Sequence, residues 1–385
     1  MAKTYAEINE RIEGGDAVVM TAEEAIDYVR RNGAGKAAKE IDVVTTATFG
    51  CMCSSGAFLN VGHSKPRIKF GGGHVTLNGV ECYAGLAAVD LYVGATARNS
   101  EPGVPELSYG GGHVIADIVA GKDVLLKARG VPSSCYPRSE LEKWINIEEL
   151  PHAVLVNPRN AYQNYNVAVN CGKKTIYTYM GKLLPEMGNA NYGTCGQLSP
   201  LLKDPHCRTI GIGTRIWLAG AQGYVFWSGT QHNPGVPRGK NGIPLGGAGT
   251  LGVCGDMKSM DPGYVVGASF TGYGISLALG LGVPVPVLDE DMMKSLAVPD
   301  DEILAPVVDY GKDYPQSTGK VLKHVSYAQL RSGTIDVHGK EVPTGSMSSY
   351  RKAREISRKL KTEVSKGRFL LQEPVQQLPF GKVRR

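Results

Sequence analysis

The sequence lacks the features of several protein classes. Its first ten residues contain no apolar run of the kind that forms a secretory signal, so we expect a cytoplasmic chain. We also expect its eight cysteines to stay reduced there. Charged residues make up only 20% of the chain and hydrophobic residues 42%, which excludes an intrinsically disordered protein. The 50 glycines follow no Gly-X-Y period, which excludes a collagen-like chain.

Common metal and nucleotide motifs are also missing. The cysteines form no Cys-X-X-Cys pair, so a zinc site is not predicted. None of the glycine clusters has the spacing of a P-loop or a dinucleotide fingerprint. The net charge is +6, and many of the basic residues lie within 351–385, down to Lys382, Arg384 and Arg385. Because no aromatic platform accompanies them, we interpret this segment as a solvated helix face and expect no nucleic-acid partner.

One segment is long and uncharged enough to require a membrane test. Residues 263–288 carry no charge, but they contain six glycines and the prolines Pro284 and Pro286. Glycine and proline at this density favour a buried strand, a buried helix or a pocket wall over a membrane helix. We therefore predict a buried segment and no membrane association.

Local patterns predict a mixed α/β (α+β) protein with helices at both termini and a glycine-rich, strand-heavy central region. Thr21 and Glu24 form a capping box for a helix that ends at Gly33. The β-branched run 42–48 predicts a strand that leads directly into a Gly/Ser/Cys loop. Asn78-Gly79 is typical of a hairpin turn, and a last helix is predicted over 348–366.

The organisation into domains is less clearly marked. We predict one domain over residues 1–385, with a candidate subdivision near 140–150, where we also predict a short helix. The string Gly-Gly-Gly-His-Val occurs at 71–75 and again at 110–114. An internal duplication is therefore an open alternative.

Two loops that carry cysteine are the main chemical signal. Cys51 and Cys53 follow the predicted strand 42–48, and Cys135 lies in a Ser/Pro loop after another candidate strand. Free backbone amides and a nearby cation such as Arg138 favour the thiolate, which is the nucleophilic form of cysteine. Inert packing of these cysteines, or ligation of an iron–sulfur cluster, are the alternatives.

Other polar residues are candidates to complete a site. Arg159 is a candidate clamp for a carboxylate, because a guanidinium group pairs with a carboxylate through two hydrogen bonds. His63 is a candidate general acid or base. Two further hypotheses follow: an acyl-transfer enzyme with a Cys–His pair, and a non-catalytic iron–sulfur or sulfur-relay protein.

Three strings resemble the motifs of the homocysteine-biosynthesis family of sulfurtransferases: Met52-Cys53-Ser-Ser-Gly-Ala-Phe-Leu-Asn60, Gly62-His-Ser64 and Ser134-Cys135-Tyr-Pro-Arg138. The resemblance covers about residues 3–379 and includes the segment Pro343-Thr-Gly-Ser-Met-Ser-Ser-Tyr-Arg-Lys-Ala-Arg-Glu355. Members of the family are L-aspartate semialdehyde sulfurtransferases, which replace the aldehyde oxygen with sulfur and reduce the product to homocysteine. Many members carry paired CBS domains after this module, and this sequence shows none.

The resemblance implies a set of functional residues and partners. Its motifs place the catalytic thiols at Cys135 and Cys53. Its substrates would be L-aspartate semialdehyde and sulfide, and a small ferredoxin-like protein would donate electrons. A homo-oligomer is an open alternative. Candidate substrate-binding residues are Arg138, Arg159, His63, Ser54 and Ser55.

The resemblance also implies a mechanism. Some members hold an oxygen-sensitive iron–sulfur cluster, for which Cys53 and Cys135 are candidate ligands. Cys51 is not part of the family motif and is a weaker candidate ligand. We expect Cys53 and Cys135 to converge on one pocket. A persulfide on Cys135, or a sulfide held by a cluster, would attack the aldehyde carbon there, and Cys53 would resolve the intermediate as a disulfide.

Overall fold

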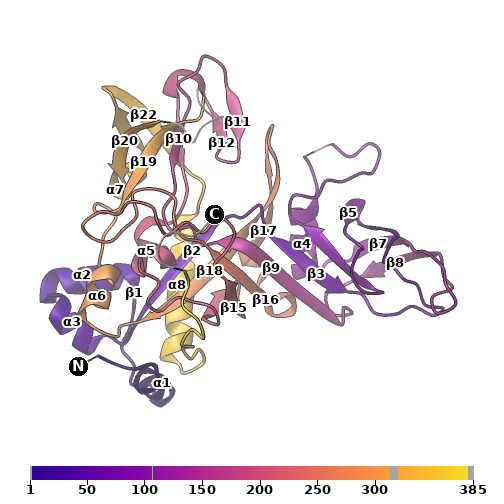
Figure 1. Cartoon of the computed structure of the whole chain (residues 1–385), viewed down its shortest axis with the longest axis horizontal. Coiled ribbons are helices and arrows are strands. Elements are labelled where there is room, and N and C mark those ends of the chain that lie inside the picture. Colours follow the sequence, from indigo (N-terminus) through magenta and orange to yellow (C-terminus); the bar gives the residue numbers. More distant parts are fainter. Residues whose placement is uncertain (1, 106, 312–319, 380–385) are drawn as a thin grey trace.

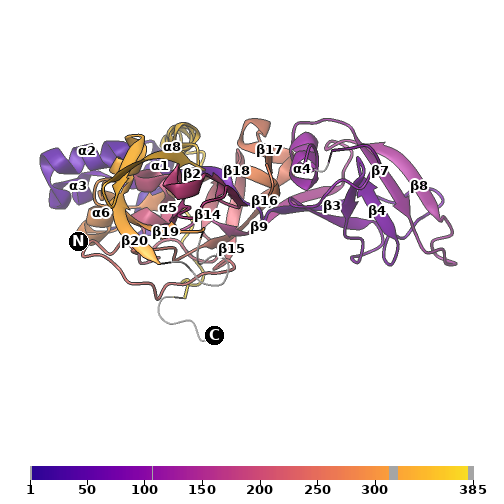
Figure 2. The same cartoon turned by 90° about the horizontal axis from the view of Figure 1, so that it is seen from above.

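The computed structural model describes residues 2–105, 107–311 and 320–379 (Figure 1). It confirms a mixed α/β protein with helices at both termini and strands between them. Seen from two directions, the molecule is elongated, with the N-terminal helices at one end and a small sheet at the other (Figures 1 and 2). The basic residues Lys382, Arg384 and Arg385 lie outside the described residues.

A large mixed sheet forms the centre of the molecule. Its strand order is β1-β2-β18-β14-β15-β16-β9-β3-β6, and β17 pairs with β18. The strands are β1 (Val19–Thr21), β2 (Val43–Cys51), β18 (Gly274–Pro286), β14 (Arg215–Leu218), β15 (Ala221–Trp227), β16 (Leu251–Asp256), β9 (His152–Asn160), β3 (Gly56–Asn60), β6 (Asp90–Gly94) and β17 (Val265–Phe270).

The uncharged segment 263–288 supplies the buried core of this sheet. It folds into the antiparallel pair β17 and β18, and β18 is buried along nearly its whole length. Helix α8 (Tyr350–Ser365) covers β18 and β2. A Cβ atom at Gly280 would come within 2.9 Å of Ile356 on α8, so glycine lets the helix approach the strand closely. No helix in the described part of the chain is long and apolar enough to span a membrane.

Helices cover the end of the sheet that carries the N-terminus. Thr21 and Glu24 form the predicted capping box, which begins α2, and Gly33 follows its last residue. The helices at this end are α1 (Tyr5–Gly14), α2 (Ala22–Asn32), α3 (Ala34–Glu40) and α6 (Glu290–Leu296).

A second sheet stands beside the central one and has its own apolar core. Its order is β20-β19-β10-β13-β22-β21, with α7 (Tyr327–Arg331) packed on it. A separate hairpin, β11 (Ile176–Thr178) with β12 (Gly181–Leu183), projects next to this sheet (Figure 1). The six strands are β20 (Val321–Ser326), β19 (Leu304–Asp309), β10 (Val167–Val169), β13 (Ala190–Tyr192), β22 (Lys340–Ser346) and β21 (Thr334–Val337).

The small sheet at the far end has the order β5-β4-β7-β8, and we call it the distal lobe. Its strands are β5 (Val80–Cys82), β4 (His74–Leu77), β7 (Val124–Arg129) and β8 (Glu140–Ile145). Helix α4 (Gly111–Val119) connects it to the central sheet by packing against β17. The Asn78-Gly79 hairpin turn is confirmed: it joins β4 and β5, and both residues have positive φ.

One prediction fails in this region, and one open alternative gains no support. Residues 140–145 form strand β8, not a helix, because each of them pairs with a residue of β7. The repeated Gly-Gly-Gly-His-Val string adopts two different structures: residues 71–73 form a turn before β4, whereas 110–112 begin α4. The structure therefore gives the duplication no support. The subdivision near 140–150 stays a prediction.

Candidate active site

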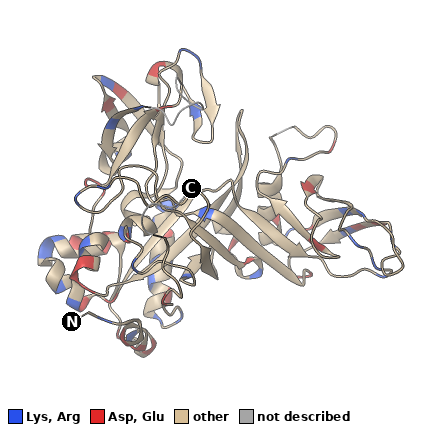
Figure 3. Cartoon of the chain, viewed as in Figure 1, with Lys and Arg blue, Asp and Glu red and all other residues tan. Residues whose placement is uncertain are grey.

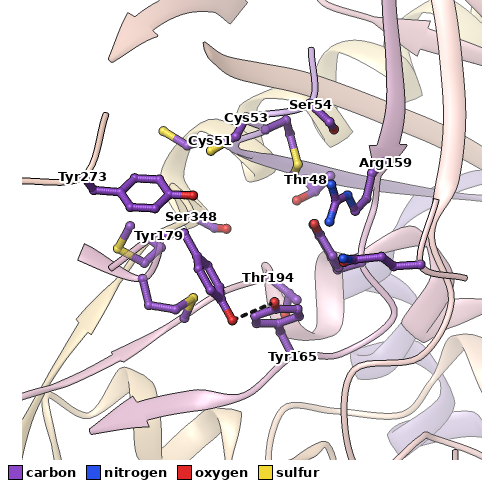
Figure 4. Close-up of a pocket in the computed structure, with 16 residues that line it drawn as sticks. Thr48, Cys51, Cys53, Ser54, Arg159, Tyr165, Tyr179, Thr194, Tyr273 and Ser348 are labelled. Carbon is purple, nitrogen blue, oxygen red and sulfur yellow. Dashed lines mark hydrogen bonds between the residues drawn. The ribbon is translucent and has the colours of Figure 1, made fainter. Parts of the chain in front are cut away.

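Strand β2 and the turn after it position two thiols. Cys51 is the last residue of β2 and Cys53 lies in the following turn, and both are half-buried. The Met52 amide donates a hydrogen bond to the Leu277 carbonyl at 2.8 Å, which fixes the turn to β18. Cys51 and Cys53 line the same cavity, which Figure 4 shows.

The buried side chain of Asn157 joins this turn to strand β9. Its Oδ1 accepts hydrogen bonds from the Ser54 hydroxyl at 3.2 Å and from the Arg159 amide at 2.7 Å. Its Nδ2 donates to the Ser55 hydroxyl at 2.7 Å, and Ser55 donates in turn to the Met52 carbonyl at 2.8 Å. One side chain therefore holds the cysteine turn and Arg159 at a fixed separation.

The cavity has a volume of about 350 Å³, near the small end of the usual range for ligand pockets. Arg159 is the one Lys or Arg side chain among the described residues that line it, so the cavity attracts anions. Thiol, hydroxyl and thioether groups supply the rest of its chemistry. The lining residues are Thr48, Cys51, Met52, Cys53, Ser54, Arg159, Tyr162, Tyr165, Tyr179, Met180, Gly193, Thr194, Gln231, Tyr273, Met347 and Ser348.

Tyrosines form the wall opposite the cysteines. The Tyr165 hydroxyl donates to that of Tyr179 at 3.3 Å (Figure 4). The Tyr179 and Tyr310 hydroxyls lie 2.9 Å apart. Burial raises the pKa of Tyr165 and of Tyr179 above the ordinary tyrosine value. Burial also raises the pKa of Tyr162, although Arg159 beside it acts in the opposite direction. At neutral pH these hydroxyls are protonated and available as hydrogen-bond donors.

The two thiols have a hydroxyl group nearby. The Ser276 hydroxyl, fully buried on β18, donates a hydrogen bond to the Cys53 sulfur at 3.3 Å and lies near the Cys51 thiol. Burial, with a smaller contribution from Cys53, raises the pKa of Cys51 to about 11. Cys51 is therefore a protonated thiol at neutral pH.

Sequence-predicted site residues are divided between two places. Cys53, Ser54 and Arg159 lie together in the cavity, with Cys51. Ser55 is buried beneath the turn, and both of its hydrogen bonds support the turn, so it does not line the cavity. The expectation that Ser55 faces a substrate is not met.

The structure does not bring Cys135 to Cys53 within one chain. Cys135 is exposed in the loop between β7 and β8, on the distal lobe (Figures 1 and 2). His63 lies with this loop, its ring 6.1 Å from that of Tyr136, and Arg138 donates to the Lys65 carbonyl at 3.4 Å. The five-residue strand β3 runs from the cysteine turn toward the lobe and separates the two places. The expectation of one shared pocket is therefore wrong for a single chain.

The geometry of the cavity also bears on two alternatives, a Cys–His acyl-transfer enzyme and an iron–sulfur protein. No histidine is among the described residues that line the cavity, so a Cys–His pair for acyl transfer is not formed there. Within the described ranges, no three His, Cys, Asp or Glu side chains lie close enough to hold a metal ion. An iron–sulfur cluster usually takes four cysteine ligands. The described residues of one chain therefore do not fit such a cluster.

Several cavity residues were missed by the sequence analysis. Tyr162 and Tyr165 stand in an Asn/Tyr-rich loop after β9, a composition that could have pointed to them. Asn157 and Ser276, which support the cysteine turn, carry no local signal, because only the assembly of β9 and β18 into the central sheet brings them there. Tyr179 lies in the turn between β11 and β12, and only the tertiary fold brings that hairpin to the cavity.

A small polar cavity that combines two thiols, a guanidinium group and protonated phenols suits thiol chemistry on a small anion. A family model described as homocysteine biosynthesis enzyme, sulfur-incorporation, matches residues 17–371. The chain belongs to this family.

Named relatives agree with this assignment. The L-aspartate semialdehyde sulfurtransferase of Methanosarcina acetivorans is 46% identical over 379 residues, which cover 98% of this chain and 72% of that protein. The protein of the same name from Methanocaldococcus jannaschii is 47% identical over 389 residues, covering 98% of this chain and 73% of the relative. An uncharacterized protein of Methanothermobacter thermautotrophicus is 32% identical over 338 residues, or 86% of this chain and 72% of that protein. No solved structure matches the chain.

Proposed function

We propose that this chain is an L-aspartate semialdehyde sulfurtransferase acting in the cytoplasm. It converts L-aspartate semialdehyde, sulfide, two electrons and two protons into L-homocysteine and water. The observation that carries the proposal is identity of 46% and 47%, over 98% of the chain, to two relatives with this name. The cavity supports it independently, because its size and its charge suit a small amino acid aldehyde.

Each of several lining residues has its own role in this reaction. Arg159 pairs with the substrate carboxylate and orients the aldehyde toward the cysteine turn. The protonated hydroxyl of Tyr179 faces the cavity, accepts a hydrogen bond from Tyr165 and donates its own to the aldehyde oxygen as that oxygen leaves as water. After sulfide has replaced the aldehyde oxygen, Cys53 is the thiol that bonds to the sulfur of the resulting carbon–sulfur double bond, and the substrate carbon takes up the proton.

The electrons come from a small ferredoxin-like protein, for which α8 offers a docking face. Arg351, Arg358 and Lys359 line a surface groove along this helix. Arg351 and Arg358 are exposed and have no ion-pair partner among the residues the structure describes. Charged residues lie on the terminal helices, including α8, and on the outer sheets, whereas the central strands are nearly free of them (Figure 3). A basic face of this kind attracts an acidic protein.

Cys135 is the second functional thiol in this proposal, because the motif around it resembles that of the family. Its exposed position lets a sulfur donor reach it. Because it lies outside the cavity of its own chain, it serves a second copy of the chain in a homo-oligomer. The test mixes Cys53→Ser with Cys135→Ser protein. The proposal expects the mixture to regain activity that neither variant has alone, and no gain over the separate variants would contradict it.

The central experiment measures homocysteine formation from L-aspartate semialdehyde and sulfide under anaerobic conditions with excess dithiothreitol. The wild-type protein should turn over repeatedly, and Cys53→Ser should lose about a hundredfold or more of the rate, as expected for removal of a nucleophile. Cys254→Ser, a half-buried strand cysteine outside the cavity, is the matched control and should keep the rate. A wild-type protein that forms no homocysteine would instead favour the sulfur-relay hypothesis.

A further inference from the structure

We propose that Cys51 and Cys53 act as a pair, and that closing them into a disulfide supplies the two electrons of the sulfur-incorporation reaction. This inference rests on the function proposed above and assigns a role to Cys51, which the family motif does not include. It makes the chain itself the immediate reductant of the sulfur-bearing intermediate. An external donor then only has to reopen the disulfide.

The backbone places the two sulfurs within reach of each other. Residues two apart have Cα atoms no more than about 7 Å apart in any backbone conformation, which is about the limit for a disulfide. Cys51 ends β2 and Cys53 follows in the turn, and both side chains face the cavity (Figure 4). The Ser276 hydroxyl donates a hydrogen bond to the Cys53 sulfur and lies near the Cys51 thiol, so both thiols stand beside one residue.

The environments of the two thiols differ in a way that separates their roles. Burial raises the pKa of Cys51 to about 11, so this thiol keeps its proton while substrate binds. Cys53 lies beside Tyr162 and Arg159, nearer the groups that orient the substrate. Cys53 is therefore the attacking thiol and Cys51 the resolving thiol, which carries the proton that the product needs.

The proposed steps balance in atoms and electrons. Sulfide adds to the aldehyde carbon and water leaves, which gives a carbon–sulfur double bond. The Cys53 sulfur then bonds to the substrate sulfur while the substrate carbon takes up a proton, and the result is a mixed disulfide. Cys51 attacks the Cys53 sulfur, the bond from Cys53 to the substrate sulfur breaks, and homocysteine leaves with the Cys51 proton. The pair has lost two electrons, and an external dithiol or electron-transfer protein returns them.

A single-turnover experiment tests this sequence. Reduced wild-type protein, freed of reductant under anaerobic conditions, is mixed with L-aspartate semialdehyde and sulfide. The mixture is quenched with N-ethylmaleimide and analysed by peptide mass spectrometry. The proposal expects close to one homocysteine per chain and a Cys51–Cys53 disulfide in the peptide that contains both residues. Unchanged free thiols at both positions, with homocysteine formed, would overturn it.

Variants of Cys51 isolate the resolving step. Cys51→Ser and Cys51→Ala should release about one tenth or less of the wild-type homocysteine in the single turnover and accumulate homocysteine bound to Cys53. Cys254→Ser is the control and should match the wild type. Full release by both Cys51 variants would overturn the proposal.

Excess dithiothreitol separates the two proposals. External thiol replaces Cys51, so the Cys51 variants should regain most of their turnover. Recovery of this kind also shows that they are folded. If the wild-type protein makes homocysteine with excess reductant but never forms the Cys51–Cys53 disulfide, this inference fails and the proposed function stands. If the wild-type protein makes no homocysteine under any condition, the proposed function fails.

Discussion

Asn157 holds the cysteine turn and Arg159 together, and replacing it with alanine tests that arrangement. The substitution removes three hydrogen bonds of a fully buried side chain, to Ser54, Ser55 and the Arg159 amide. At about 1 kcal/mol net for each bond, we expect a loss of about 3 kcal/mol in the free energy of unfolding. Because misplacement of a catalytic group by about 1 Å costs about a hundredfold in rate, we expect kcat to fall by a similar factor.

The assay separates positioning from simple destabilisation. Steady-state homocysteine formation is measured at a temperature where chemical denaturation shows the variant to be folded. Asn146→Ala is the control, because Asn146 also makes three hydrogen bonds, to Gly121, Asp123 and Glu148, but lies outside the cavity. It should lower stability and leave kcat near the wild-type value. An Asn157→Ala protein that is destabilised yet keeps its kcat would refute the positioning role.

Two further predictions follow from single residues. Arg159→Gln should lower kcat/KM by about 10- to 100-fold, mainly by raising KM, because a charged hydrogen bond to the carboxylate is worth about 1.5–3 kcal/mol. Steady-state kinetics measure this change. An equal loss in Arg129→Gln, an exposed control, would contradict the prediction. Burial lowers the pKa of Lys203 to about 7, so wild-type stability should rise with pH between about 7 and 10.5, as the folded protein no longer has to hold the charge. Lys203→Met should therefore stabilise most at pH 7 and below, with a gain that shrinks toward pH 10; denaturation at several pH values checks this, and a constant gain would contradict it.

Much of the fold follows from local sequence because the signals are local. The Thr21 capping box, the Asn78-Gly79 turn and the β-branched strand before Cys51 each depend on neighbouring residues, and each is present. The local pattern over 140–150 predicts a helix, but residues 140–145 form a strand because they pair with β7. A partner strand leaves no mark on the sequence of the segment itself.

The site was predictable only in part for the same reason. Cys53 and Ser54 are adjacent in sequence, so their joint presence in the cavity follows from one turn. Arg159 joins them because β9 pairs with β3 on one edge and β16 on the other, which no spacing in the sequence reveals. Cys135 has an equally reactive local context, but the lobe that carries it lies away from the cavity. The sequence of a loop shows which groups are adjacent to a thiol along the chain, but not which distant residues the fold brings next to it.

The most direct test of the central claim is whether substrate occupies the cavity of Cys53. The rate of Cys53 alkylation by iodoacetamide is measured by peptide mass spectrometry with and without L-aspartate semialdehyde, in the absence of sulfide. The account predicts that the substrate slows alkylation of Cys53 and that Arg159→Gln removes this protection, while Cys254 reacts at the same rate throughout. Equal rates at Cys53 with and without saturating substrate would contradict the account.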